Sequence, residues 1–167
     1  MTLPIHLRAL EPEDLEWVYA LENTPDVAEV SADHVPVSRY AVQRYLSQQP
    51  ATPLETGELR LVVCTGDDVV AGLIDLTSID FYNAHAEVGI ALIPSFRKQG
   101  VAQQALQAIE AKARQLALCV LTAHVPVHVA SSVRLFQRAG YTLIGTLPQY
   151  YNGQNGREDV LLFLKEI

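Results

Sequence analysis

The sequence predicts a mixed α/β (α+β) fold, a three-layer sandwich with roughly six to seven strands flanked by about four helices. Three observations support this prediction. Apolar, strand-like runs at 59–65, 69–79 and 86–93 are joined by short turns, which is typical of an antiparallel meander. The third run leads through a basic turn into a long helical pattern without proline or glycine. Further strand-like runs then alternate with one more helical stretch, so the central sheet should be mixed but mostly antiparallel.

Length, composition and charge limit the class of protein. The chain has 167 residues, 49% of them hydrophobic, so we expect one domain over 1–167 with a sizeable core. Its start lacks the features of a secretory signal, and no apolar run is long enough to cross a bilayer, which predicts a cytoplasmic protein without a membrane partner. The formal net charge of −7, with no basic stripe, argues against nucleic-acid binding. It suits a cationic substrate, although many soluble proteins are equally acidic.

The first third of the chain predicts one strand and two helices. Residues 5–10 alternate as in a half-buried strand, and Pro12 with neighbouring acids begins a helix that ends near 23. Ser38 can cap a second helix that continues to about 47. The stretches 23–37 and 48–57 are rich in turn-forming residues and are expected to be loops.

The remainder predicts six strands and two helices. Strands 59–65 and 69–79 flank a turn that begins with Gly66, which predicts a hairpin. The later expected elements are, in order, strand 86–93, a helix up to 117, strand 118–125, helix 131–139, strand 141–146 and strand 159–165. Cys64 and Cys119 both fall in apolar runs, so we expect them to be reduced core residues and not a disulfide or metal site.

An anion site is predicted where strand 86–93 leads into the long helix. Pro94 ends the strand, and the turn that follows contains Arg97, Lys98 and Gly100. The first N–H groups of a helix have no partner within it and attract negative charge, and glycine lets a phosphate approach the backbone. The alternative is an ordinary surface loop, because basic turns are common.

Three segments resemble the GNAT superfamily of N-acetyltransferases, within it the branch that holds spermidine and ribosomal-protein N-terminal acetyltransferases. Residues 97–102, Arg-Lys-Gln-Gly-Val-Ala, are similar to its pyrophosphate signature R/Q-x-x-G-x-G/A. Residues 86–90 resemble the strand before it, and 132–141 resemble its later helix-to-strand signature. The resemblance covers nearly the whole chain, and it implies a GNAT-like sandwich that transfers acetyl from acetyl-CoA to a primary amine without an acyl-enzyme.

The resemblance also implies which residues bind the cosubstrate acetyl-CoA. Backbone N–H groups of the turn and the helix start should hold the pyrophosphate. The pantetheine should pair with free backbone at Leu92 and Ile93, and an N–H near Ala91 should face the thioester oxygen. The cofactor-binding residues expected in this way are Ala91, Leu92, Ile93, Arg97, Lys98, Gln99, Gly100, Val101, Ala102, Gln103 and Ser132.

An amine with a pKa of roughly 10 must lose a proton before it attacks, so the reaction needs a base. Glu87 is the first candidate, because it is a carboxylate in an otherwise apolar strand and matches a glutamate of the histone-acetyltransferase branch. The alternative is a solvated or purely structural residue. Four further acids could bind a cationic acceptor, although each could equally be a surface carboxylate: Glu29, Asp33, Asp75 and Asp80.

The sequence departs from the family at two positions. Phe136 stands where relatives carry the tyrosine that protonates the departing thiolate, so Tyr141, or else Tyr150 or Tyr151, would have to replace it. Val129 stands where relatives often place a cofactor-binding asparagine, and Ser132 could make that contact instead.

The histidines predict no metal site. His124 and His128 have helical spacing, but Pro126 lies between them, so we expect no metal there. His124 could border the acceptor channel or be an ordinary strand-end residue.

The preferred function is N-acetylation of a polyamine or other small amine. The alternatives are acetylation of a peptide N-terminus, an acyl-CoA-binding module with weak turnover, or a purely structural protein. A homodimer would be in keeping with the resemblance.

Overall fold

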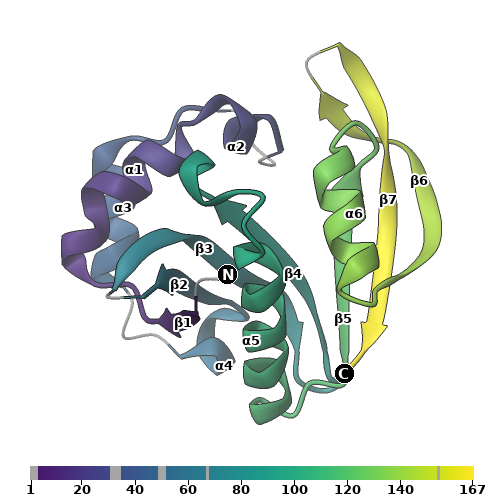
Figure 1. Ribbon diagram of the computed structural model, residues 1–167, viewed down its shortest axis with the longest axis horizontal. Helices are drawn as coiled ribbons and strands as arrows, with labels where there is room; N and C mark the ends of the chain where they lie inside the picture. The colour runs from purple at the N-terminus through teal and green to yellow at the C-terminus, as the bar shows by residue number, and fades with distance from the viewer. Residues whose placement is uncertain (1–3, 31–34, 49–51, 67, 154) are drawn as a thin grey trace.

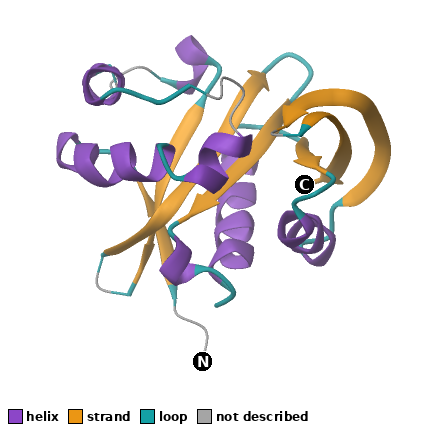
Figure 2. Cartoon of the chain, turned by 90° about the horizontal axis from the view of Figure 1, so that it is seen from above, coloured by secondary structure: helices purple, strands orange, loops and turns teal. Residues whose placement is uncertain are grey.

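The computed structural model describes residues 4–30, 35–48, 52–66, 68–153 and 155–167. They form one seven-stranded sheet in the order β1-β2-β3-β4-β5-β7-β6, with helices on both of its faces (Figures 1 and 2). The strands are β1 Ile5–Arg8, β2 Leu59–Thr65, β3 Val69–Asp80, β4 His85–Leu92, β5 Val120–Pro126, β6 Thr142–Gly153 and β7 Gly156–Glu166. All neighbouring strands are antiparallel except β4 and β5, which confirms the predicted mixed, mostly antiparallel sheet.

The described helices outnumber the four that the sequence predicts. Six α-helices are present: α1 Leu15–Glu22, α2 Pro25–Val30, α3 Arg39–Ser47, α4 Pro53–Thr56, α5 Val101–Gln115 and α6 Ala130–Arg138. The short helices α2 and α4 lie in the two stretches expected to be loops. Each begins with proline at a position where its missing N–H costs no helical hydrogen bond, so proline starts a helix here instead of breaking one.

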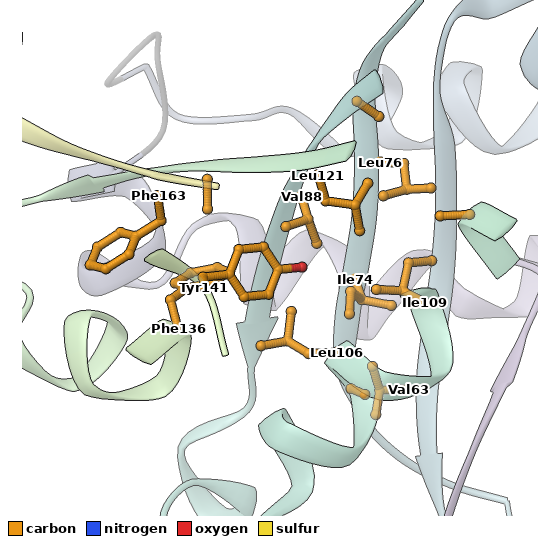
Figure 3. Packing of buried hydrophobic residues seen from close by; sticks show 14 of the residues in the cluster. Val63, Ile74, Leu76, Val88, Leu106, Ile109, Leu121, Phe136, Tyr141 and Phe163 are labelled. Atoms are coloured by element: carbon orange, nitrogen blue, oxygen red, sulfur yellow. The ribbon is translucent and has the colours of Figure 1, made fainter. Parts of the chain in front are cut away.

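Two hydrophobic cores cover the two faces of the sheet. On one face, α5 buries Leu106 and Ile109 against strand residues such as Ile74, and α6 adds Phe136 (Figure 3). On the other face, α1 and α3 pack on β2 and β3, with Val18 and Leu46 among the buried residues. The sheet between these helical layers gives the predicted sandwich. Among the described residues, no helix combines the length and apolar character needed to cross a membrane.

The expectation that both cysteines lie in the core is wrong for Cys119. Cys64 is fully buried on the α1/α3 face, but Cys119 is exposed. It follows Leu118, which is buried, and precedes the first residue of β5, so the apolar run there begins before the strand does.

Candidate functional site

The start of α5 presents unpaired backbone donors. Lys98 and Gly100 have positive φ angles of 60° and 79°, which turn the chain sharply so that Gly100 caps the helix. The first backbone hydrogen bond of the helix runs from Gln104 N–H to the Gly100 carbonyl at 3.2 Å. The N–H groups of the intervening residues 101–103 donate to no acceptor in the described part of the chain. Three donors at the positive end of a 15-residue helix can bind an anion.

Arg97 in the preceding turn has other partners. Its Nε donates to the Leu92 carbonyl at 2.9 Å, and its guanidinium pairs with Asp26 in α2. The hydrogen bond from Arg97 lowers the pKa of Asp26. Arg97 therefore connects the end of β4 to α2, and Lys98, which is exposed, supplies the formal positive charge of the turn. Gln99 folds back, with its Nε2 2.6 Å from the Ser95 carbonyl.

Strands β4 and β5 separate beside this turn. They pair only over residues 85–87 of β4 and 120–122 of β5, and then diverge (Figure 1). We call residues 88–92 and 123–126 the β4/β5 fork. Backbone groups on its inner sides have no neighbouring strand to bind, so an extended ligand can pair with them.

The alternation of the β3–β4 ladder decides which β4 groups face the fork. Ile93 N–H donates to the Ala71 carbonyl of β3 at 2.9 Å, so the expectation of free backbone there is wrong. Because bonding alternates along an antiparallel pair, Ala91, opposite Leu73, also directs its N–H to β3 and not to the thioester position expected for it. The groups that face the fork belong to Ile90 and Leu92.

Side chains of the fork divide between the two faces of the sheet. Val88 on β4 and Ala123 on β5 are buried in the α5/α6 core. Successive side chains of a strand alternate, so Glu87 and His124 lie on the opposite face, towards α1 and α3. A molecule that reaches the fork from the start of α5 would meet these two side chains on the far side of the sheet.

Glu87 and His124 form the centre of a polar cluster on that face. Glu87 Oε1 lies 2.9 Å from His124 Nδ1, and the two side chains are 34% and 26% exposed. The imidazole stacks on Tyr150 of β6, with ring centroids 6.1 Å apart. Burial raises the pKa of Tyr151, and the negative charges of Glu87 and Glu158 raise it further. We call Glu87, His124, Tyr150, Tyr151 and Glu158 the acceptor-face cluster.

Part of this cluster could not be identified from the sequence. Glu158 pairs with His128, its Oε2 2.6 Å from His128 Nδ1. It lies opposite Tyr151 in the β6–β7 ladder. In the sequence it appears only as a charged residue before the strand expected at 159–165, and the pairing of β6 with β7 is what places it opposite Tyr151.

Tyr141 lies in the α5-side core. It is 4% exposed and meets Phe136 edge-on at 5.1 Å, with Phe163 beyond (Figure 3). Its hydroxyl makes no hydrogen bond with the described residues. Burial, followed by the nearby negative charge of Glu110, raises the pKa of Tyr141 well above its usual value. Phe136 is buried too, and offers no proton.

The acids expected to bind the acceptor do not come together. Asp75 accepts two hydrogen bonds from Arg60, at 2.9 and 2.8 Å, and Arg60 also binds Glu22. Asp80 accepts hydrogen bonds from the backbone and the side chain of Asn83 in the β3–β4 turn, and these bonds lower the pKa of Asp80. This turn lies at the end of β4 that is remote from the fork. Glu29 belongs to α2, without a described side chain, and Asp33 lies outside the described residues.

The start of α6 carries Val129 at the position where relatives of the resembling family often place an asparagine. Val129 is the N-cap residue and makes no side-chain cap hydrogen bond. Ser132 lies in the first turn, where its N–H donates to the Val129 carbonyl at 3.0 Å. Its hydroxyl makes no hydrogen bond with the described residues, so it can bind a ligand beside the fork.

One group of described side chains has donor atoms close enough to hold a metal ion. These atoms, from His6, Cys64 and Asp68, lie within 4.8 Å of one another. His6 Nε2 already bonds Asp68 at 2.8 Å, and burial raises the pKa of the Cys64 thiol, which disfavours the thiolate a metal would need. His6 lies on β1, Cys64 on β2 and Asp68 in the turn between β2 and β3. Strand β3 therefore separates the group from β4, and the group has no connection with the fork.

Comparison with known proteins gives a consistent family. Residues 5–142 match the model described as "Acetyltransferase (GNAT) domain". The chain is 27% identical to spermidine N(1)-acetyltransferase of Escherichia coli strain K12, covering 90% of this chain and 80% of that protein. It is 25% identical to the enzyme of the same name from Vibrio cholerae, covering 92% and 89%. A crystal structure of spermidine N-acetyltransferase from Vibrio cholerae with CoA and spermine superposes with a TM-score of 0.88 at 22% identity, over 97% of this chain and 95% of that one.

Proposed function

This chain belongs to the GNAT family of acetyltransferases, and from that premise we propose that it transfers acetyl from acetyl-CoA to a primary amine of a polyamine. The observation that carries the proposal is the set of unpaired N–H groups at 101–103 beside the diverging strands β4 and β5. These features would hold a diphosphate at one end of an extended ligand and the reactive group at the other.

Each part of acetyl-CoA has a counterpart in this region. The diphosphate would accept from residues 101–103, with Lys98 adding positive charge. The pantetheine would run along the β4 side of the fork, where Ile90 and Leu92 present backbone groups. One of these two N–H groups would then donate to the thioester oxygen as negative charge develops there, in place of Ala91.

The charge of the acceptor face supports a cationic substrate. Glu87 and Glu158 each lie close enough to Tyr151 for their negative charges to raise its pKa. Glu22, Asp75 and Arg60 on α1, β3 and β2 form a further network with one more negative than positive charge. A polyamine carries ammonium groups along its length and could contact several such carboxylates. The relatives are named for spermidine, and the Vibrio cholerae structure contains spermine.

Tyr141, the candidate replacement for the missing tyrosine acid, is a poor general acid for the departing thiolate. A thiol has a pKa near ~8.5, so a phenol whose pKa is raised above its usual ~10 is the weaker acid. Its hydroxyl is also enclosed in the α5-side core, away from solvent.

A binding module with weak turnover is the second candidate. Phe136 and Val129, which replace residues with cofactor-directed roles in the resembling family, are the observation that favours it. Such a module would bind acetyl-CoA but release no thiol with any amine. A peptide N-terminus is the alternative acceptor. In the same assay, thiol would then be released with short peptides and not with polyamines.

The proposal is tested by following release of free CoA thiol from acetyl-CoA with spermidine, spermine, small monoamines and short peptides. We expect release with the polyamines. Gly100→Glu should abolish it, because the new carboxylate would stand against the diphosphate and the melting temperature would no longer rise with CoA. Gly66→Glu is the matched control, since Gly66 also has a positive φ and a Cβ there would meet nothing within 4 Å. Thiol release by Gly100→Glu at the parent rate would refute the placement of the cofactor.

We further propose that the chain assembles with copies of itself. Edge strand β6 exposes Leu143 and Ile144 to 47% and 51%, which suits burial against a second copy in a homodimer or larger assembly. A Vibrio cholerae spermidine N-acetyltransferase structure is described as dodecameric. A solution mass equal to a single chain would contradict assembly. We propose a cytoplasmic location because acetyl-CoA is an intracellular cosubstrate.

A further inference from the structure

We propose that His124 is the group that takes the proton from the substrate ammonium, through its Nε2 atom, and that Glu87 acts as the positioning residue behind it. This inference rests on the proposed function and specifies its proton-transfer step. Glu87 is thereby moved from direct base to the partner that orients the base.

The contacts of the imidazole define its two nitrogens. Nδ1 lies 2.9 Å from Glu87 Oε1, and the negative charge of that carboxylate favours the tautomer that carries its hydrogen on Nδ1. In the neutral ring, Nε2 then holds the free lone pair. Nε2 makes no hydrogen bond with any described residue, and the imidazole lies nearly parallel to the ring of Tyr150, at an interplanar angle of 14°. A carboxylate that orients an imidazole in this way is the arrangement by which proteins prepare a histidine to accept a proton.

Open space lies beside this pair on the same face. Gly89 follows Glu87 by two residues on β4, so both point away from the α5/α6 core. A Cβ added at Gly89 would meet nothing within 4 Å. An amine could therefore approach the fork next to His124 without displacing a side chain at that position.

The charged groups around His124 favour a cation at this place. Glu87 faces the ring from β4, and Tyr150 faces it from β6. Tyr151 on β6 interacts electrostatically with Glu87 and with Glu158 on β7. His128 neutralises part of the charge of Glu158 only when the histidine is protonated. The described surroundings thus contribute two carboxylates, which stabilise both an incoming ammonium and the imidazolium formed when it loses its proton.

An imidazole is the better acceptor for this proton. A carboxylate with a pKa of about 4.3 lies some six units below an amine of about 10.4, whereas an imidazole of about 6.5 lies four units below it. Proton transfer to the imidazole is therefore less unfavourable by a factor of about 100. One carboxylate oxygen of Glu87 already lies 2.9 Å from His124 Nδ1, which leaves the carboxylate less suited to act alone.

The reaction balances with these groups alone. The ammonium gives one proton to His124 Nε2, and the nitrogen lone pair forms a bond to the thioester carbon. The C–S bond of the tetrahedral intermediate breaks, and its electron pair leaves on sulfur. The second proton lost by the nitrogen goes to the thiolate, so the products are an amide and CoA thiol. The imidazolium then releases the first proton to water.

The test compares His124→Gln with His85→Gln in the thiol-release assay with spermidine across pH. Glutamine is polar and can donate to Glu87, but it does not accept a proton at these pH values. His85 is the matched control, since it also lies near a carboxylate, 3.7 Å from Asp80, at the end of β4 remote from the fork. We expect His124→Gln to lower kcat about 10²–10⁴-fold at neutral pH, with an unchanged melting shift by CoA.

The pH profile separates a proton acceptor from a structural residue. The parent should show an acid-side loss of kcat/KM as the proton acceptor becomes protonated, and His124→Gln should lack that inflection. Its rate should rise towards alkaline pH, where more of the amine is unprotonated. Glu87→Gln should reduce the rate but retain the inflection.

Three outcomes would overturn the inference. If His124→Gln keeps the parent rate and profile, His124 is not the base. If Glu87→Gln abolishes the inflection while His124→Gln does not, the carboxylate accepts the proton directly. If the parent protein releases no thiol with any amine, the proposed function fails, and this inference fails with it. That failure is seen in the parent alone, so it can be told apart from a failure of the inference, which is seen only when the His124→Gln protein is compared with an active parent.

Discussion

Asp14 is the most heavily bonded carboxylate in the described structure. It accepts two hydrogen bonds from Arg8 at 2.8 Å, one from Glu11 N–H at 2.8 Å and one from Trp17 Nε1 at 2.7 Å. It closes the 3-10 turn Pro12–Asp14 that leads into α1. Burial alone would raise the pKa of Asp14, but these hydrogen bonds lower it overall. A single residue thus fixes the strand–helix junction beneath the α1/α3 face.

Asp14→Asn should reduce the free energy of unfolding by about 2–4 kcal/mol at pH 7, because Arg8 would lose its charged partner in a buried position. Since the folded-state pKa of Asp14 is lowered, its contribution is present above the unfolded value of about 3.9 and is lost as pH falls below it. The deficit should therefore shrink by pH 3. Urea unfolding at both pH values measures it, with exposed Glu13→Gln as the control. A deficit that is equal at pH 7 and pH 3 would show that the charge of Asp14 is irrelevant.

At the scale of elements, the β3–β4 ladder directs the backbone of the fork. Gly72 permits a very close approach of the two strands, since a Cβ added there would lie 2.1 Å from the Ala91 carbonyl oxygen. This approach sits beside the bonded contact between Ile93 and Ala71 that turns the odd-numbered N–H groups of β4 towards β3. The register of β3 against β4 therefore decides which groups of β4 remain free for a ligand, and Gly72 permits the close approach of the two strands.

Gly72→Ala should separate the strands locally and cost about 1–3 kcal/mol of stability. It should also weaken CoA binding, because the backbone at Ile90 and Leu92 would shift. The measurements are thermal unfolding and the melting shift with CoA. Gly89→Ala is the stability control, as its Cβ has open space. A Gly72→Ala protein as stable as the Gly89→Ala protein would contradict the close approach.

Local sequence signals predicted the elements where one residue type marks each boundary. Pro94 and Gly100 bound the turn before α5, so β4 and α5 were predicted within a residue or two at the turn. Strand β6 was expected over 141–146 but extends to Gly153. It passes Pro148, which a central strand would not tolerate. On an edge strand the missing N–H costs nothing, and the register breaks between Leu147 and Tyr151.

The site was less predictable than the elements, because its geometry arises from pairing between distant segments. The helix start at 101–103 follows from one continuous stretch. The meeting of Glu87 with His124 depends on the parallel register of β4 and β5, and that of Tyr151 with Glu158 on the β6–β7 ladder. The directions of the Ala91 and Ile93 N–H groups depend on which residues of β4 are hydrogen-bonded to β3. No local pattern contains that information.

For the whole molecule, the proposed function uses two faces of opposite character. The start of α5 attracts an anion on one side of the fork, and the acceptor-face cluster attracts a cation on the other. The net charge of −7 adds a general attraction for polyamines. In the proposed function the sheet would keep the two ligands apart except where β4 and β5 diverge, so transfer would be confined to the fork.

Salt should therefore affect polyamine substrates strongly. The Debye length is about 10 Å at 0.1 M and about 3 Å at 1 M, so the field of several carboxylates is screened over this range. We expect KM for spermidine to rise several-fold between 0.05 and roughly 0.5 M NaCl, and KM for a monoamine to rise less. Saturating acetyl-CoA keeps cofactor binding out of the comparison. Equal salt dependence for both amines would show that the acceptor-face charges do not select a polycation.

A crystal structure of the protein with CoA tests the central claim most directly. The account predicts the diphosphate within hydrogen-bond distance of the N–H groups of residues 101–103. It also predicts the pantetheine between β4 and β5, with the thiol on the path to His124. A diphosphate bound elsewhere, or a pantetheine that does not enter the β4/β5 fork, would contradict it.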